Sequence, residues 1–241
     1  MEPPTSSIFL CAFTYGNVTA HTAFSLANEM REMDKRGITF ESRNLHNDAL
    51  ISRSRSKALT DFLLGSRLDV CVMVDHDVEW EAGMLSALAS KAHELQSCVA
   101  GIYACRGVGC GVATRVLTPT SFKGLEDKII EAQYLATGFL AIPRVAAEEV
   151  LKIGLGKDEA NQAIHPCKYS DGSLMYDFFR PISVPLVGSS SYEYLSEDYA
   201  FGWRCRAANP SRKLYAWTKP WLRHHGNYGF TVDQAYVERR G

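Results

Sequence analysis

The chain has 241 residues, of which 46% are hydrophobic and 22% are charged, so it fits one medium globular domain with a sizeable core. The formal net charge of −1 argues against a nucleic-acid-binding surface spread over the whole protein and leaves room only for a local basic pocket. No apolar run approaches the roughly 20 residues that cross a bilayer, so we expect no transmembrane segment.

The cysteine pattern and the first residues both bear on the cellular compartment. The seven cysteines are an odd number, and none of them forms a Cys-x-x-Cys pair or a zinc-type spacing. This indicates free thiols in a reducing environment. Residues 1–7 carry two prolines and no basic stretch, which is not the pattern of a signal peptide. We therefore expect a cytoplasmic protein.

The first third of the chain alternates between strand and helix patterns. The predicted elements are a buried strand over residues 8–13, a helix that ends at Gly37, a strand over 38–45, a helix over 52–65 that Ser52 caps, and a buried strand over 70–74. This order predicts a right-handed, mostly parallel sheet with helices on its faces.

The rest of the chain continues the alternation less regularly. We expect a helix over residues 84–95, a strand over 97–103, a loop and hairpin over 105–120, a strand over 134–142, a helix from Pro143 to 153, loops and edge strands over 154–191, a helix over 197–208 and a strand over 213–217. There is no internal repeat and no linker, which predicts a single domain over residues 1–241.

Two aspartates lie where a ligand is expected. Asp75 and Asp77 directly follow the predicted strand over residues 70–74, and parallel sheets bind ligands at the carboxyl ends of their strands. Two carboxylates this close repel each other, and a divalent ion that also bridges phosphate oxygens removes the conflict. The alternative is that one aspartate caps the next helix. We expect Mn²⁺ or Mg²⁺ as the cofactor.

Three further residues point toward the same edge of the sheet. Arg55 has helical spacing to Leu59 and Phe62, so it starts on the core-facing side of its helix, where a cation needs an anion. It either contacts a nucleotide or diphosphate or makes an internal ion pair. Thr14 and Tyr15, at the tip of the first strand, would lie beside a base, with Tyr15 offering its flat ring; a merely exposed tyrosine is the alternative.

The segment Val-Met-Val-Asp-His-Asp-Val-Glu-Trp at residues 72–80 resembles the DxD segment of nucleotide-sugar glycosyltransferases with the GT-A fold, and is closest to a small bacterial and viral type. Ser56 stands where that type usually has Asn, and Arg106 stands where it more often has Lys. Other short matches follow in the same order along the chain, at residues 50–59, 101–106, 136–144, 196–201 and 222–226.

The resemblance implies a single GT-A domain, Rossmann-like, with residues 8–105 as the nucleotide-binding half and 106–230 as the acceptor half. It implies transfer of a sugar from a nucleotide diphosphate to a carbohydrate or other hydroxyl acceptor. A UDP-sugar is favoured over a GDP-sugar only because UDP donors are common in this fold.

It also implies a metal site. Asp77 would bind the ion, and Asp75 would contact the ribose or a metal-bound water. His224 would be the third protein ligand because a neutral imidazole accepts that role, with His225 as its competitor. His76, between the aspartates, belongs to the nucleotide-sugar contacts.

The remaining site residues follow from the same matches. Arg106 would contact the diphosphate, or is simply solvated, and Gly138 would lie under the donor sugar. Glu197 and Asp198 would bind the acceptor or deprotonate its hydroxyl, with Asp198 preferred as the base if the enzyme inverts. The alternative is that both only favour the start of a helix that Ser196 caps.

Three other functions compete with this hypothesis. A haloacid-dehalogenase-type phosphatase also carries Asp-x-Asp after a buried strand, but after the first one, and no clear Gly-Asp-x-x-x-Asp follows here. A sugar nucleotidyltransferase needs a Gly-rich, Arg-containing loop after the first strand, which residues 13–17 do not supply. A non-catalytic nucleotide- or carbohydrate-binding module would keep the fold without turnover.

Overall fold

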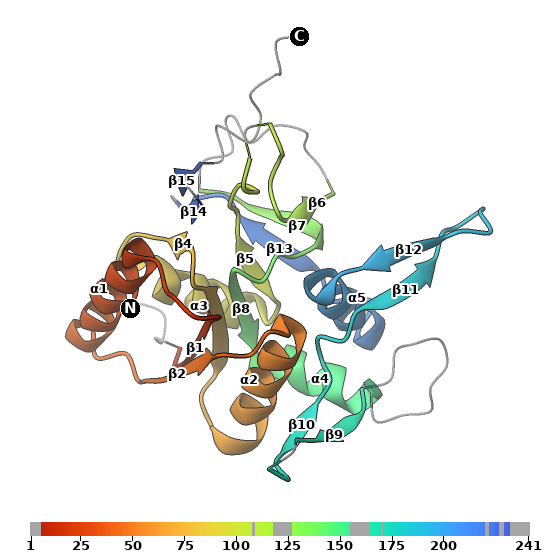
Figure 1. The fold of residues 1–241 in the computed structure, drawn as a ribbon, viewed down its shortest axis with the longest axis horizontal. Helices are drawn as coiled ribbons and strands as arrows, with labels where there is room; N and C mark the ends of the chain where they lie inside the picture. Colours follow the sequence, from red (N-terminus) through yellow and green to blue (C-terminus); the bar gives the residue numbers. More distant parts are fainter. Residues whose placement is uncertain are drawn as a thin grey trace.

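The computed structural model describes residues 6–107, 109–117, 127–154, 164–169, 171–219, 222–226 and 229–231. Within these residues, a central eight-stranded sheet separates two layers of helices (Figure 1). Its strands lie in the order β2 (Phe40–His46), β1 (Ile8–Thr14), β3 (Val70–Asp75), β8 (Phe139–Pro143), β5 (Val99–Gly101), β13 (Leu214–Trp217), β7 (Ile129–Tyr134) and β6 (Arg115–Val116).

The strand directions are mixed. β1 is parallel to both β2 and β3, and β5 is parallel to β13. β8 is antiparallel to β3 and β5, and β7 is antiparallel to β13 and β6. Six of the eight described strands therefore point one way, and β7 and β8 oppose them. The predicted α/β class, with a mixed, mostly parallel sheet flanked by helices, is confirmed.

The apolar run of β3 explains why the sheet is covered on both faces. Val70, Val72 and Val74 belong to one hydrophobic cluster, whereas Cys71 and Met73 belong to the other. Successive side chains of a strand point to opposite faces, so a continuous apolar run marks a strand that is buried on both sides.

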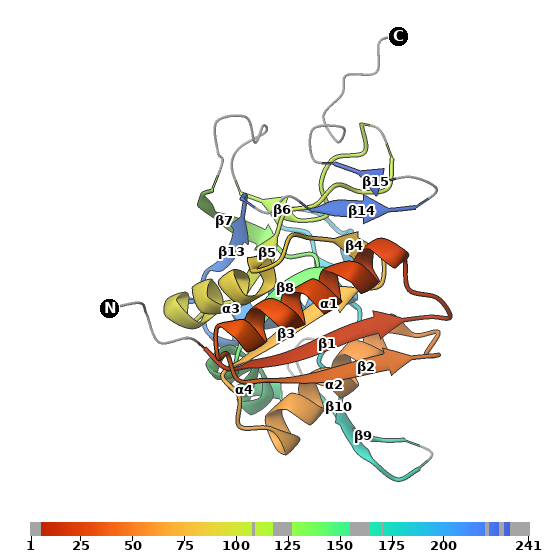
Figure 2. The same cartoon turned by 90° about the vertical axis from the view of Figure 1, so that its left-hand side faces the viewer.

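Two helical layers cover these faces (Figure 2). The side chains of α1 and α3 pack into one hydrophobic cluster, and those of α2, α4 and α5 pack into the other. The bounds are α1 (Ala20–Lys35), α2 (Ile51–Gly65), α3 (Met84–Leu95), α4 (Arg144–Gly154) and α5 (Glu197–Ala208). The predicted bounds of α3 and α5 are confirmed to the residue.

Three local predictions are wrong. The helix expected from Pro143 begins at Arg144, because Pro143 is the last residue of β8. Residues 134–142 do not form one strand, because β7 ends at Tyr134 and β8 begins at Phe139. β7 pairs with β13 and β6, whereas β8 pairs with β3 and β5, and this difference in partners is not encoded in the local pattern. Ser52 does not cap α2, which begins at Ile51 after Leu50 without a side-chain cap. Asp48 accepts the Leu50 N–H instead, at 2.9 Å.

Smaller sheets surround the central one. β14 (Arg223–His225) lies between β15 (Gly229–Phe230) and β4 (Val78–Glu79), and two hairpins pair β9 (Pro166–Lys168) with β10 (Leu174–Tyr176) and β11 (Ile182–Pro185) with β12 (Tyr192–Leu195). These hairpins agree with the edge strands predicted over residues 154–191, of which 155–163 and 170 lie outside the described residues. The hairpin predicted over 105–120 is described in part, with an antiparallel bridge between Ala104 and Val112, whereas residues 108 and 118–120 lie outside.

A buried carboxylate fixes the chain just after the two aspartates. Glu29 on α1 is fully buried and accepts the backbone N–H groups of Gly83 at 2.8 Å and Ser86 at 3.0 Å. An anion at the start of a helix is favoured by the helix dipole and by the free N–H groups there. Glu29 also accepts the indole N–H of Trp80 at 3.3 Å. These hydrogen bonds connect α1 to the segment over residues 78–83 and to the start of α3.

Strands from the two predicted halves are interleaved. β8 lies between β3 and β5, so residues 8–105 and 106–230 share one sheet. The assignment of nucleotide and acceptor roles to these halves stays a prediction. Among the helices that the structure describes, none has the length and apolar character that a membrane crossing needs.

Candidate functional site

A cavity of about 340 Å³ opens at the carboxyl ends of β1 and β3. Eight of the eleven residues predicted for the site line it, although they come from five segments that are distant in sequence. These residues are Thr14, Tyr15, Arg55, Asp75, His76, Asp77, Arg106 and Glu197. The structure therefore brings together most of the predicted set. The other three, Gly138, Asp198 and His224, do not line the cavity, and their places are described below.

The floor of the cavity is a buried ion-pair network around Arg55. Its guanidinium donates hydrogen bonds to Asp75 Oδ1 and to Glu197 Oε1, both at 2.6 Å. Burial would lower the pKa of Arg55, but the two carboxylates outweigh it and raise the pKa, so the side chain stays charged. The internal ion pair that the sequence left as an alternative is present, and contact of Arg55 with a ligand stays a prediction.

Asp77 lies beside this network and is almost entirely buried, with 4% of its side chain exposed. Its Oδ2 lies 2.8 Å from the guanidinium of Arg106, and its Oδ1 lies 3.5 Å from Nε2 of His224. Burial would raise the pKa of the Asp77 carboxyl, but the positive charge of Arg106 helps to hold it below its usual value. Asp77 is therefore an ionised, buried carboxylate that faces cationic and imidazole groups.

His224 is held in a defined tautomer. Its Nδ1 lies 2.9 Å from the carbonyl oxygen of Ala104, which can only accept, so Nδ1 carries the proton. Nε2 then keeps its lone pair, which accepts the Nε–H of Arg106 at 3.2 Å. The ring of Tyr103 meets that of His224 edge-on at 5.2 Å. A histidine whose second nitrogen donates to a backbone carbonyl is oriented as metal-binding histidines usually are.

His224 and His225 point to different surroundings because they are neighbours on the short strand β14. His224 faces Asp77, whereas His225 Nε2 lies 2.8 Å from Glu79 Oε2. Of the two histidines that the sequence left open, His224 is thus the one beside the aspartates. Its role as a metal ligand stays a prediction.

Gly138 lies against Asp75, where a side chain would not fit. Its N–H donates to the hydroxyl of Tyr103 at 3.0 Å, and its carbonyl accepts the N–H of Asp75 at 3.0 Å. A Cβ at this position would lie 2.5 Å from the Tyr103 hydroxyl oxygen and 3.1 Å from Asp75 Oδ2. Glycine therefore permits the close approach of β8 to the aspartate segment.

Glu197 and Asp198 begin α5 but face different partners. Glu197 lines the cavity and binds Arg55, as described above. Asp198 does not line the cavity, and its Oδ1 accepts the Ser196 hydroxyl and the Tyr199 N–H. Ser196 makes no side-chain cap to the helix backbone. Of the two, only Glu197 thus lines the cavity, and the catalytic roles of both stay predictions.

Tyr103 is one residue near the site that sequence reasoning missed. Its hydroxyl and ring contact Gly138 and His224, and it is buried. Burial, together with the nearby charge of Asp75, raises the pKa of Tyr103 well above 10, so it stays a neutral hydroxyl. A tyrosine near the end of a predicted strand gives no signal by itself, because its partners follow from long-range packing.

Comparisons with known proteins bear on the fold. Comparison with protein-family models gives no match, and comparison with curated protein sequences gives no match either. Among solved structures, A197 from STIV is similar with a TM-score of 0.54 and 15% identity, and the alignment covers 98% of this chain and 100% of that chain. At this identity the likeness shows the fold alone.

Two nucleotide-sugar enzymes show weaker similarity. Apo-UDP-glucose pyrophosphorylase aligns with a TM-score of 0.42 and 9% identity over 90% of this chain and 76% of that chain. A Bacillus anthracis protein assigned as a glucose-1-phosphate thymidylyltransferase, in complex with sucrose, aligns with a TM-score of 0.47 and 10% identity over 98% of each chain. Scores this low decide nothing about activity, so the resemblance to GT-A glycosyltransferases stays a prediction.

Proposed function

We propose that this protein is a metal-dependent glycosyltransferase that moves a sugar from a nucleotide diphosphate, with a UDP-sugar favoured, to a carbohydrate hydroxyl. The observation that carries the proposal is the buried carboxylate of Asp77, which faces a solvent-exposed arginine and an imidazole lone pair at the edge of a cavity large enough for part of a ligand. The proposal also rests on the resemblance of residues 72–80 to the DxD segment.

The residues beside the cavity fit a divalent ion. Asp77 and His224 would hold it, with Asp75 contacting the ribose or a metal-bound water. Carboxylate and imidazole groups suit Mn²⁺, and an ion with few protein ligands leaves positions for phosphate oxygens, as Mg²⁺ also does. The ion would supply neutralisation of the charge that gathers on the departing diphosphate.

Arg106 is the movable member of the site. Just over half of its side chain is exposed, so it forms its contacts with Asp77 and His224 from the solvent side. Those contacts give the buried carboxylate a positive partner in the free protein. A turn of this side chain toward the cavity would direct its guanidinium at a diphosphate, which it can bind with two parallel hydrogen bonds. Arg106 is thus a contact to the leaving group.

Tyr15 and Thr14 would bind the other end of the donor. Tyr15 lines the cavity with about two thirds of its surface exposed, so its ring is free to stack on a base. Gly138, which the resemblance puts under the donor sugar, lets β8 approach Asp75 closely.

The start of α5 would serve the acceptor. Glu197 is bound by Arg55, and a carboxylate held by a guanidinium is better suited to accept a hydrogen bond from the acceptor than to remove its proton. Asp198 receives both of its hydrogen bonds on Oδ1. We keep it as the base for an inverting transfer and assign acceptor binding to Glu197.

Calorimetry with UDP and with GDP, each with and without Mn²⁺, tests the proposal. We expect UDP to bind in a metal-dependent way, and Asp77→Asn and His224→Ala to weaken that binding by at least about tenfold, since even outer partners of metal ligands contribute about 10- to 100-fold. His165→Ala, which changes an exposed histidine outside the cavity, is the matched control. Absence of metal-dependent binding of either nucleotide would overturn the proposal.

Two further measurements separate the competing functions. Slow hydrolysis of one UDP-sugar among several would identify the donor and exclude a non-catalytic module. A phosphoaspartate trapped with a phosphate analogue in the native protein, and lost in Asp75→Asn, would instead identify a phosphatase.

A further inference from the structure

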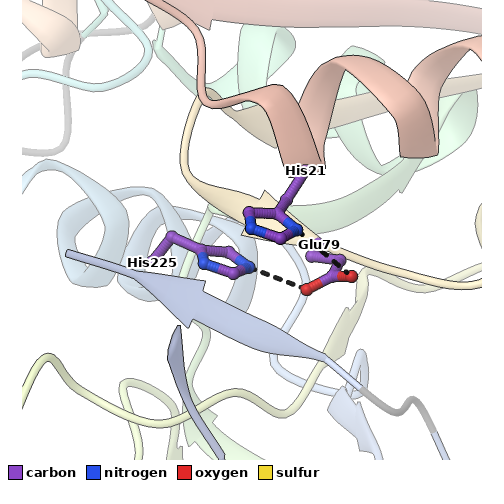
Figure 3. Close-up of side chains that lie close together, drawn as sticks. All are labelled: His21, Glu79 and His225. Carbon is purple, nitrogen blue, oxygen red and sulfur yellow. Dashed lines mark hydrogen bonds and ion pairs between the residues drawn. The ribbon is translucent and has the colours of Figure 1, made fainter. Parts of the chain in front are cut away.

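A second cluster of ligating side chains includes Glu79, two residues after Asp77, and lies outside the cavity lining. His21 from α1, Glu79 from β4 and His225 from β14 converge there from three segments of the chain (Figure 3). One ligand atom from each lies within 4.8 Å of the other two. None of the three lines the 340 Å³ cavity.

The geometry joins two imidazoles to one carboxylate. His225 Nε2 lies 2.8 Å from Glu79 Oε2, and His21 Nδ1 lies 3.7 Å from Glu79 Oε1 (Figure 3). The two rings stack at 4.2 Å with an interplanar angle of 5°. The lone pairs of parallel rings lie in parallel planes, so a shared ion requires one ring to tilt. His21 can do so because 58% of its side chain is exposed.

The fold fixes the other two residues. His225 has only 9% of its side chain exposed, and its backbone N–H donates to the carbonyl of Asp77 at 2.7 Å. Gly229, its partner across the β14–β15 pair, leaves room for the ring, since a Cβ there would lie 3.1 Å from His225 Cε1. Thr22, next to His21, donates to the carbonyl of Val78, so the helix is held in register with Glu79.

We propose that His21, Glu79 and His225 form a second metal site, which takes a borderline transition ion such as Zn²⁺. Two imidazoles and one carboxylate are a ligand set that Zn²⁺ uses, and ligand sets with imidazole disfavour Mg²⁺. The exposed side of His21 leaves a position for water. The site is separate from that of Asp77, because His224 and His225 face different surroundings.

One positive group of the protein already faces this site. The guanidinium of Arg223 lies 3.9 Å from Glu79 Oε2, a longer and weaker contact than that of His225. Its side chain is 39% exposed and can withdraw into water. Binding of the ion joins the start of α1 to β4 and to β14. β4 directly follows Asp77, and β14 carries His224. The ion therefore stiffens the segments that hold the cavity's own metal ligands.

Calorimetric titration of the full chain with ZnCl₂ tests this inference. His224→Ala is used as the background, so that the site at Asp77 does not contribute. We expect this background to bind one Zn²⁺ per chain, with Mg²⁺ in excess unable to displace it. Adding Glu79→Gln or His225→Ala should weaken binding by at least about 100-fold, because a direct ligand matters at least as much as the outer partners that contribute about 10- to 100-fold. Adding His165→Ala should leave it unchanged.

His21→Ala keeps the test decisive if a buried variant misfolds. His21 is exposed, so its replacement should leave the circular dichroism and the melting temperature without metal unchanged while it weakens Zn²⁺ binding and removes the rise in melting temperature that Zn²⁺ gives the background. Zn²⁺ binding that survives both His21→Ala and Glu79→Gln would assign the ion to other groups, such as the exposed thiol of Cys110, and would overturn the inference. So would a background protein that binds no Zn²⁺.

Discussion

Replacing Arg55 by methionine removes the cation that joins Asp75 to Glu197 at the floor of the cavity. Methionine has a similar length and suits an apolar interior, so the change leaves Asp75 and Glu197 in place without their shared partner. The Arg55 side chain is only 4% exposed, and it holds each carboxylate at 2.6 Å. The variant therefore tests the buried charge rather than the packing.

The expected cost follows from the burial of the three groups. Removing one partner of a buried ion pair costs about 3–5 kcal/mol, because the other charge stays buried without compensation. Asp75 and Glu197 keep 23% and 21% of their side chains exposed, so water can solvate them in part. We therefore expect a loss of about 3 kcal/mol in the free energy of unfolding, at the lower end of that range. The protein should still fold, since domains are stable by about 5–15 kcal/mol.

Urea denaturation followed by tryptophan fluorescence measures this loss. Lys57→Met is the matched control on the same helix, because Lys57 pairs with Asp61 at 3.5 Å near the surface, where ion pairs contribute little. Adding Asp75→Asn and Glu197→Gln to Arg55→Met should recover most of the stability, since the uncompensated charges are then gone. A loss below about 1 kcal/mol in Arg55→Met, or no recovery in the triple variant, would refute the reasoning.

Two further variants address the close approach of β8 to Asp75 and the start of β3. Gly138→Ala should lower stability by about 1–3 kcal/mol through overpacking against Tyr103 and should weaken UDP binding, whereas Gly65→Ala, with open space around its Cβ position, should do neither; equal unfolding curves for the two would contradict the close approach. The Asp69 carboxylate accepts the N–H and hydroxyl of Ser7 at 2.9 and 2.7 Å; burial opposes ionisation, but these bonds outweigh it and lower its pKa. The wild type should therefore exceed Asp69→Asn in free energy of unfolding above about pH 4, the pKa in the unfolded chain, and the difference should shrink as the pH falls through the lower folded pKa. A pH-independent difference would show that Asp69 acts without its charge.

Local sequence patterns were sufficient to predict the bounds of an element when those bounds depend only on the side chains of that element. The helix expected over residues 84–95 from the continuing helical pattern is observed with those bounds. The strand over 97–103 exists but is shorter, as Val99–Gly101. Strand ends depend on which neighbours pair with them, so they are less well determined by sequence.

The carboxyl ends of β1 and β3 illustrate what a sequence determines about a site. The run over residues 70–74 predicted a strand buried on both faces, and strand order then placed Asp75 and Asp77 at a ligand-binding edge. The helical spacing of Arg55 predicted a buried cation that needs an anion. These statements need only short-range periodicity and the cost of burying charge.

Only the tertiary structure decided which groups meet. Arg55 bonds to Glu197, which lies 142 positions away in the chain, and no periodicity relates the two. His224 and His225 are adjacent in sequence, yet one faces Asp77 and the other faces Glu79 and His21. Their assignment depends on the register of β14 against β4, and a shift of one residue would exchange them. The sequence thus determined which chemical groups the protein has available, and the long-range pairing of strands determined how they are combined.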